Sequence, residues 1–583
     1  MKLIIKEYLA SLREREELDA VLPDLLSQMG MTVFSRPGRG TRQDGVDVAA
    51  FGAIDGEEDA VYLFSVKPHD LKRSDWDTSS PQSLRPSLVE IQETYIRNRL
   101  PREYREKKIK ICICVGGDIR EDIRPNIEAY KDRSSTDQIS FEEWNGDRMA
   151  SLIESHFLKE ELLPDMARSN LRKALALIDE PNVSYKHFAI LVESFLSSSI
   201  EKPEQKKRVM RQLSICLWIL FAWAREQNNL ESTYLAAELL LLRLWELVRE
   251  YLEEDTKMSA SIQSVYFSVF QTFLNVGNEL LSKTAVKNAS KQHALSQSVR
   301  GSTPLEINLR LFDLAGRVSL FGLWLRWYSF QFPQGSDEQN DLLGTSSAYS
   351  DALKGIINNN PILLLPIKDD QCIDVALTVL LLMMEGDQKS ILGWLEQMVG
   401  RAKFAYRFHK LYPCNISTYH ELLEHPRRDG DYRQNVTAGS ILYPFISIIA
   451  AMLEDQPLYG AVKEFKNNDL GHCNFQYWYP DDDTESHLYS NKKMHGANLS
   501  GIDVERDPES LLNQVFSECE NMAQFNDLSA IKFGFWPLMT TACRHHRLPV
   551  PLHLFRQFSG KNERDEGESK SCSDREATSG QES

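Results

Sequence analysis

The sequence predicts an α/β N-terminal domain, in which helices flank a mixed β-sheet, followed by a large all-α region. Two patterns lead to this prediction. Up to about residue 160, helical and strand-like segments alternate, which is typical of sheets covered by helices. From about residue 165 to 555, apolar residues recur almost wholly at helical spacing. We therefore divide the chain into residues 1–165, residues 166–558 and a tail of residues 559–583.

The first region contains the segments of a complete sheet-and-helix core. Residues 14–29 place apolar side chains on one helical face; Pro23 should kink this helix and Gly30 should end it. Residues 108–115 form a continuous apolar run of the kind buried inside a mixed sheet. The other expected strands are 31–34, 46–51, 61–66 and 138–144, and the other expected helices are 84–98, 119–131 and 147–158.

The second region predicts antiparallel helices packed as a stack or bundle, in one or two subdomains. No side-chain signature recurs at the repeat lengths of helical solenoids, so the sequence does not establish a solenoid. The tail is polar and charged and has too few large apolar groups to bury a core, which predicts disorder.

Composition and charge limit the location of the protein and the kind of nucleic-acid binding it can perform. The longest apolar runs, 215–224 and 375–384, are shorter than the roughly 18 residues that a membrane-spanning helix needs. No signal peptide is evident, and nine scattered cysteines are typical of free thiols in a reducing cytoplasm. We therefore expect a cytoplasmic protein without membrane association. The net charge of −17 argues against non-specific coating of nucleic acid.

Two local stretches are nevertheless basic. Residues 35–42 carry three arginines and no acid, and residues 97–110 carry seven basic residues against two acids. Each stretch is either a solvated surface or a groove for phosphates. The candidate DNA-binding residues are Arg36, Arg39, Arg42, Arg97 and Arg99.

The segments Asp44-Gly45-Val46-Asp47 and Ser65-Val66-Lys67 contain candidate metal-binding and catalytic groups. Phosphodiester hydrolysis uses a hard divalent ion, and Mg²⁺ prefers carboxylate oxygens held on rigid elements, with room for water and substrate. A β-hairpin supplies such groups: one strand offers Asp47, and its neighbour offers Ser65 and Lys67 on one face. The intervening Val66 can turn its carbonyl to the metal.

The joint order of these segments resembles the metal-dependent PD-(D/E)xK nucleases, and most closely the Mrr-like restriction endonucleases. LDAVLPDLLSQMGMTV resembles their opening helix, RQDGVDVAAFG their acid-bearing strand and YLFSVK their lysine-bearing strand. SLVEIQETY is similar to the following helix, KIKICICVGGDIREDIRPNIEAY to the later strand and helix, and ISFEEWNGDRMASLIESHF to the closing pair. The resemblance covers about residues 1–165 and implies a restriction-endonuclease-like fold there.

The resemblance also implies roles for individual residues. Asp47 corresponds to the metal-binding aspartate, and Lys67 to the lysine that orients or activates the attacking water and supports the phosphate charge. Ser65 stands where the family has Glu, Asp or, in the Mrr-like branch, Gln; this is a departure, because a serine hydroxyl carries no charge. Asp19 stands where these enzymes often have a glutamate that helps the metal, and Glu17 and Glu90 are alternatives.

Two classes of function follow. The first is an endonuclease that uses Mg²⁺ or Mn²⁺ to cut DNA, as the effector of a bacterial defence system against phage or foreign DNA. Its helical region would act as a sensor, would oligomerise the chain, or would bind partner defence proteins. The second is an interaction protein whose nuclease fold is inactive and serves as a scaffold. Asp47 and Lys67 could also form only an ordinary salt bridge at a hairpin. RNA cleavage is a further alternative, because it uses the same groups.

Overall fold

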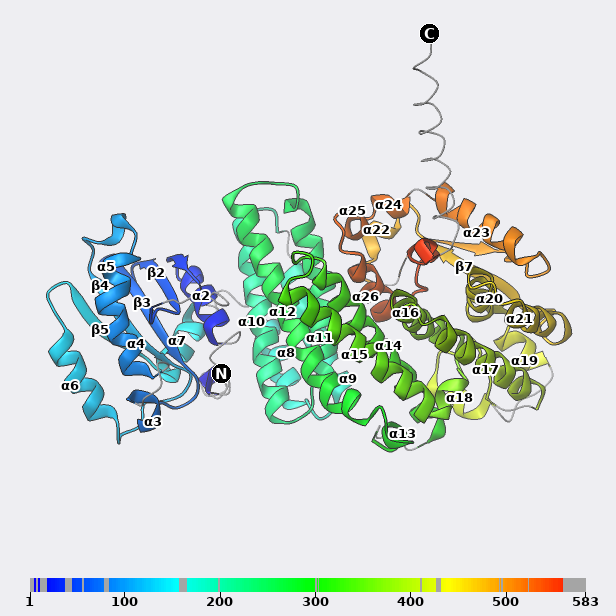
Figure 1. Cartoon of the computed structure of the whole chain (residues 1–583), viewed down its shortest axis with the longest axis horizontal. Coiled ribbons are helices and arrows are strands. Elements are labelled where there is room, and N and C mark those ends of the chain that lie inside the picture. Colours follow the sequence, from blue (N-terminus) through cyan, green and yellow to red (C-terminus); the bar gives the residue numbers. More distant parts are fainter. Residues whose placement is uncertain are drawn as a thin grey trace, which may run out of the picture. The chain divides into compact units, whose positions relative to one another are not determined.

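The computed structural model divides into two compact units, Met1–Val276 and Gly277–Ser583 (Figure 1). It describes the whole chain apart from residues 1–4, 7–8, 11–17, 37–43, 55–56, 78–82, 157–164, 198–199, 299–300, 302, 409–410, 426–430, 492, 494–495, 523 and 559–583. The predicted tail therefore lies outside the described residues. The predicted boundary at residue 165 falls at the first residue of the helix Asp165–Ala176 and stays a prediction.

The first unit contains the predicted mixed sheet. Its five strands lie in the order β1-β2-β3-β4-β5. The pairs β1–β2 and β2–β3 are antiparallel, and the pairs β3–β4 and β4–β5 are parallel. The strands are β1 (Thr32–Ser35), β2 (Val48–Gly52), β3 (Ala60–Lys67), β4 (Ile109–Val115) and β5 (Ile139–Trp144). Each of the five predicted strands is confirmed.

Helices cover both faces of this sheet. α2 and α7 pack against one face, and α3, α4 and α6 contribute to the apolar core on the other (Figure 1). The predicted helix 84–98 is confirmed in its extent, but a π-helical turn, η2, interrupts it. The bounds are α2 (Asp19–Gln28), α3 (Arg73–Trp76), α4 (Leu84–Glu90), η2 (Ile91–Tyr95), α5 (Ile96–Asn98), α6 (Arg124–Ser134) and α7 (Gly146–His156).

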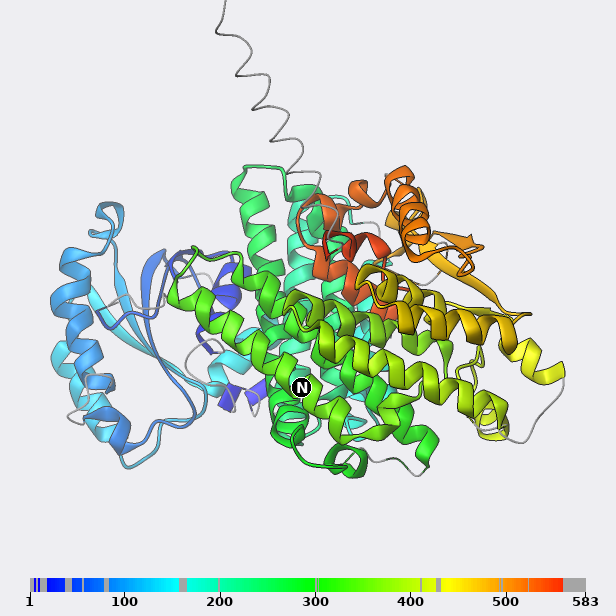
Figure 2. The same ribbon diagram turned by 45° about the vertical axis from the view of Figure 1, so that its right-hand side comes forward.

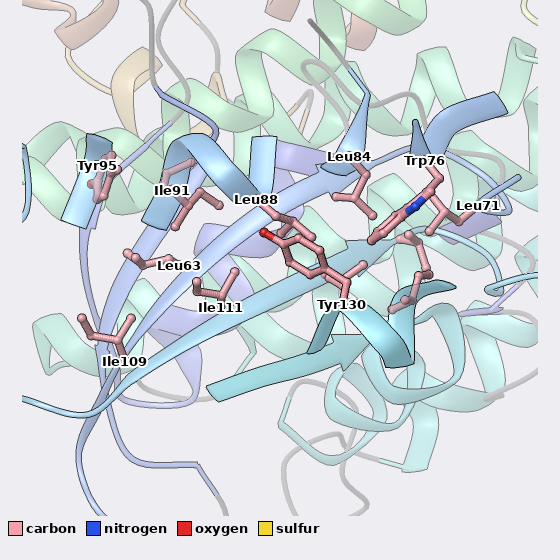
Figure 3. Close-up of a cluster of buried hydrophobic side chains, with 14 of the residues drawn as sticks. Leu63, Leu71, Trp76, Leu84, Leu88, Ile91, Tyr95, Ile109, Ile111 and Tyr130 are labelled. Atoms are coloured by element: carbon pink, nitrogen blue, oxygen red, sulfur yellow. The ribbon is translucent and has the colours of Figure 1, made fainter. Parts of the chain in front are cut away.

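The core on the second face explains why the strands fold in this register. Leu63 of β3 and Ile111 of β4 are fully buried against Leu88 of α4 and Ile91 of η2 (Figure 3). Seven residues of KIKICICV form β4, and all but Lys110 are buried, as a continuous apolar run predicts. Apolar burial of this extent is the dominant favourable term in folding.

Five long helices complete the first unit, and the last turns of the fifth belong to the second unit. α8 packs on α9, α11 packs on α9 and α10, and α10 also contacts α2. This confirms helical structure directly after the sheet domain. The bounds are α8 (Asp165–Ala176), α9 (Pro181–Leu196), α10 (Pro203–Glu226), α11 (Glu231–Val248) and α12 (Lys257–Thr284).

The second unit is also largely helical (Figure 2). Its longer helices are α14 (Pro304–Ser329), α15 (Asp337–Asn359), α16 (Cys372–Met384), α17 (Gln388–Arg407), α20 (Leu442–Met452), α21 (Gln456–Asn468), α23 (Pro508–Asn521) and α26 (Trp536–His546). Its shorter helices are α13 (Ala294–Ser298), α18 (Tyr419–Glu424), α19 (Asp431–Val436), α22 (Thr484–His487), α24 (Gln524–Asp527) and α25 (Ser529–Lys532). Among the described helices of the chain, none is long and apolar enough to cross a membrane.

The prediction that this region is entirely helical is wrong in one place. A small sheet, in the order β6-β7-β8, joins β6 (Gly439–Ser440), β7 (Asn474–Tyr479) and β8 (Ala497–Ser500). Its central strand, NFQYWY, is rich in aromatic residues, which favour strands once neighbouring strands and a core are present to pack against. Helical periodicity in the surrounding segments hides such a short strand.

Candidate functional site

Asp47 lies directly before β2, beside the end of β3. Its backbone N–H donates to the carbonyl of Phe64 at 2.8 Å, next to the Val48–Phe64 pair of the antiparallel ladder. Its Oδ2 accepts a hydrogen bond of 2.7 Å from the backbone N–H of Val66. The carboxylate is therefore bound to the strand that ends in Lys67, as the hairpin spacing predicts.

Val66 has a backbone that faces Asp47. On a β-strand the N–H and C=O groups of one residue point to the same neighbouring strand. Because the N–H of Val66 bonds Asp47, its carbonyl also lies on the β2 side of β3. The carbonyl of Lys67 points the other way and accepts from Gly116 at 3.3 Å. That this carbonyl binds a metal stays a prediction.

Ser65 and Lys67 share a face of β3 with Leu63, because side chains alternate along a strand. This is the face covered by α3, α4 and α6. Ser65 is 1% exposed and Lys67 is 9% exposed. Among the described residues, the buried hydroxyl of Ser65 has no hydrogen-bond partner. The lysine-bearing strand therefore ends in a nearly closed environment rather than in a wide cleft.

The turn before Asp47 is held from the helical side. Asp44 and Gly45 both have positive φ, of 48° and 82°. A Cβ atom on Gly45 would lie 2.2 Å from the carbonyl oxygen of Ser87, so only glycine allows this approach to α4. Asp44 is almost buried, and its Oδ2 lies 2.5 Å from Nε of Arg99. The sequence marks the segment Asp44-Gly45-Val46-Asp47 but carries no signal for this ion pair.

The other predicted residues are placed as follows. Asp19 is the first residue of α2, but its side chain lies outside the described residues, as do Glu17, Arg39 and Arg42. Glu90 is half-buried at the end of α4. Arg36 and Arg97 are exposed, after β1 and on α5. Arg99 is the member of the DNA-binding set that pairs with a carboxylate of the candidate site.

The charge of Asp47 affects a thiol on β4, which lies on the other side of β3 from β2. Burial raises the pKa of the Cys114 thiol on β4 well above its usual range, and the charge of Asp47 adds to this shift. Cys114 is completely buried, and its Sγ lies 3.5 Å from the sulfur of Met149 on α7. The thiol is therefore neutral and packs as an apolar group rather than serving as a nucleophile or metal ligand.

Within the described part of the chain, no group of three or more His, Cys, Asp or Glu side chains is placed to hold a metal ion. Among the described residues, the carboxylate that bonds β3 is Asp47, and the Ser65 hydroxyl and the Val66 carbonyl are neutral oxygens on that strand. Comparison with protein-family models, with curated proteins and with solved structures finds no match for this chain.

Proposed function

We propose that residues 1–165 are a Mg²⁺- or Mn²⁺-dependent DNA endonuclease domain of the PD-(D/E)xK class, similar to the Mrr-like enzymes. One observation carries the proposal. The Asp47 carboxylate is hydrogen-bonded to Val66, the residue immediately before Lys67. An acid and a lysine on adjacent strands, at the same end of a rigid sheet, are the groups that metal-assisted phosphodiester hydrolysis uses.

The element order gives a second, independent support. Helix α2, the antiparallel strands β1, β2 and β3, then helix, parallel strand, helix, parallel strand and helix follow each other as the resemblance implies. A fold by itself does not imply an activity. The Asp47–Val66 bond, which joins the start of β2 to β3, supports the proposal together with this element order.

The oxygen donors at the site fit Mg²⁺. This ion is commonly held by one or two carboxylates together with waters and substrate phosphates. Asp47 would be the charged ligand and the Val66 carbonyl a neutral one, and the buried Ser65 hydroxyl lacks a hydrogen-bond partner. When bound, the ion supplies a Lewis acid for the phosphate and lowers the pKa of its bound water. Lys67 would orient that water and support the charge on the phosphate.

The helical remainder completes the proposed effector. We assign it the sensing, oligomerising or partner-binding role of a bacterial defence system against phage or foreign DNA, in the cytoplasm. The assignment follows from the fusion of a nuclease-like domain to a helical region that is longer than the domain itself. Partner proteins or a second copy of the chain would regulate cutting, and RNA remains an alternative substrate.

A second candidate function is an inactive scaffold. The observation that favours it is Ser65, whose hydroxyl is buried, unpartnered and uncharged. A serine cannot replace the charge of a second carboxylate, and Lys67 is 9% exposed. In this alternative the site binds no metal, and the first domain serves only to bind other proteins.

Cleavage assays separate the two functions. The purified chain is incubated with plasmid, linear duplex and single-stranded DNA and with RNA, with and without Mg²⁺ or Mn²⁺. The controls are Lys67→Ala and Lys67→Met, the second of which keeps most of the apolar contacts of this nearly buried side chain. Metal-dependent cutting that both variants lose supports the nuclease. No cutting, together with a melting temperature that metal does not shift in an Asp47-dependent way, supports the scaffold.

A further inference from the structure

We propose that Asp44 and Arg99 are positioning residues, whose ion pair holds the turn that carries Asp47 in place. We call the Asp44–Arg99 ion pair the brace. The importance of the brace for catalysis rests on the proposed nuclease function, but its existence does not. The proposal also reassigns Arg99, which the basic pattern of the sequence marks as a DNA contact. It rests on four observations around the turn of residues 44–47.

The first observation is the pairing itself. Oδ2 of Asp44 lies 2.5 Å from Nε of Arg99, and the Asp44 side chain is 8% exposed while that of Arg99 is 44% exposed. A carboxylate this far removed from water needs a charged partner, because an unpaired buried charge is costly. The half-exposed guanidinium supplies that charge, so the pair connects the turn before β2 to the residue that follows α5.

The second observation is a backbone contact one residue later. Gly45 approaches the Ser87 carbonyl of α4 so closely that no side chain fits between them, and its φ of 82° is one that other residues rarely adopt. The turn therefore touches α4 through Gly45 and the end of α5 through Asp44. Two contacts on one continuous helical segment fix the position of the turn better than either contact alone.

The third observation concerns the helical segment between those contacts. Between Ser87 and Arg99 the helix contains the π-helical turn Ile91–Tyr95. A π-helical turn adds a residue to a helix, and it thereby changes the direction in which later side chains point. The segment ends where the N–H groups of Arg99 and Leu100 both donate to the Tyr95 carbonyl, at 2.8 and 3.0 Å. We infer that the π turn aims Arg99 at Asp44.

The fourth observation is what lies on the other side of the turn. Asp47 is bonded to β3 through Phe64 and Val66, so residues 44–47 are held between the helical segment and the strand that ends in Lys67. Arg97, on the same short helix, is exposed and has no ion-pair partner among the described residues. Of these two arginines, Arg97 can contact a phosphate, whereas Arg99 forms an ion pair with Asp44.

Amide hydrogen exchange tests the brace without any assay of activity. The Val66 N–H reports directly on Asp47, because the Asp47 carboxylate is its acceptor. In Asp44→Asn and in Arg99→Gln we expect this amide to exchange about tenfold faster, the effect of losing one charge-assisted contact. The Val61 N–H on the same strand, which donates to Lys108 at 2.9 Å, should keep its rate. Arg97→Ala is the matched control and should change neither amide.

A double-mutant cycle assigns the effect to the pair. The double variant Asp44→Asn/Arg99→Gln should exchange the Val66 amide no faster than either single variant, because the same interaction is lost in all three. Arg99→Lys keeps the charge without the planar guanidinium and should lie between wild type and Arg99→Gln. An unchanged Val66 rate in every variant, or equal acceleration of Val61 and Val66, would overturn the brace.

Calorimetric titration with Mn²⁺ then connects the brace to the site. If wild type binds the ion, the Asp44 and Arg99 variants should bind it about tenfold more weakly, as other residues that orient metal ligands do. Arg97→Ala should bind Mn²⁺ as wild type does. Full affinity in the two brace variants would remove the positioning role. Failure of wild type to bind Mn²⁺ would instead count against the nuclease function. The exchange rates would still show whether the Asp44–Arg99 ion pair holds the turn in place.

Discussion

The backbone N–H of Val66 donates a hydrogen bond of 2.7 Å to Oδ2 of Asp47. This bond joins the predicted acid of one strand to the strand that ends in the predicted lysine. Hydrogen bonds to an ionised acceptor are shorter and roughly twice as strong as neutral ones, so the position of the carboxylate is well defined. Its chemical role can therefore be separated from its structural role by the choice of substitution.

Asp47→Asn should abolish cleavage and cost less stability than Asp47→Ala, because the amide oxygen can still accept from Val66, as a neutral acceptor, while the charge is lost. Asp47→Ala should abolish cleavage and also cost about 1 kcal/mol of unfolding free energy, since the Val66 N–H loses its acceptor. Urea denaturation and a plasmid-cutting assay measure the two effects. Cutting at the wild-type rate by either variant would exclude Asp47 from the active site.

Ser65→Glu should tighten metal binding if the domain is a nuclease, because it restores an acid where the related enzymes carry one. The expected gain is on the order of 1 kcal/mol or more. Cleavage should rise or stay constant, and Asp19→Ala should become less harmful in this background, because two acids then serve one role. Calorimetric metal titration of wild type, Ser65→Glu and the double variant checks this.

The same variant behaves differently in a scaffold. There Ser65→Glu places a carboxylate beside Asp47 in a buried position, and the free energy of unfolding should fall through repulsion and desolvation. Ser65→Ala is the control: it removes the buried hydroxyl that has no partner and should stabilise the chain by about 1 kcal/mol. Absence of metal binding in wild type, Ser65→Glu and the double variant would leave only the scaffold.

Residues 1–165 should fold alone, because every buried residue of the core shown in Figure 3 lies between Val46 and Tyr130. We expect the isolated domain to unfold cooperatively in urea and to cut DNA less actively or less selectively than the full chain. Residues 1–276 provide the comparison, since α10 contacts α2 in the first unit. Loss of cooperative unfolding in the shorter fragment alone would show that the domain needs the helices that follow it.

The second unit should lose stability in mild acid because of His425. This side chain is completely buried and packs against Tyr412, with ring centroids 4.2 Å apart. Burial lowers the pKa of His425 from 6.5 to about 4. As the pH falls, the unfolded chain therefore binds the proton first. The stability is complete above pH 6.5 and is lost progressively towards pH 4.

Removing the imidazole should remove this sensitivity. Wild type should lose roughly 2–3 kcal/mol of unfolding free energy between neutral pH and about pH 4. His425→Phe keeps a ring against Tyr412 and should abolish this loss. Denaturation midpoints of wild type and variant across this range give the measurement. The control is His420→Gln, at an exposed position of α18, the helix that ends immediately before His425. This variant should follow wild type. Identical pH profiles for wild type and His425→Phe would refute the assignment.

Much of the first domain could be predicted from local patterns. The apolar runs of β3 and β4 indicate buried strands by themselves, because such a pattern depends only on neighbours in the chain. The proximity of Asp47 to Val66 also follows from the sequence, since adjacent antiparallel strands with a short connection must pair. The short strand β7 was missed because its pairing partners come from distant segments.

The sequence by itself determined the order of strands and helices in the first domain, the helical nature of most of the remainder, and Asp47 and Lys67 as the candidate metal-binding aspartate and the candidate lysine of the site. Only the tertiary structure decided that Ser65 is buried without a partner, and that Arg99 pairs with Asp44 rather than pointing to solvent. The physical reason is that burial and charge pairing depend on which distant segments pack together. In this domain, that packing depends on a π-helical turn and on the close approach of Gly45 to α4.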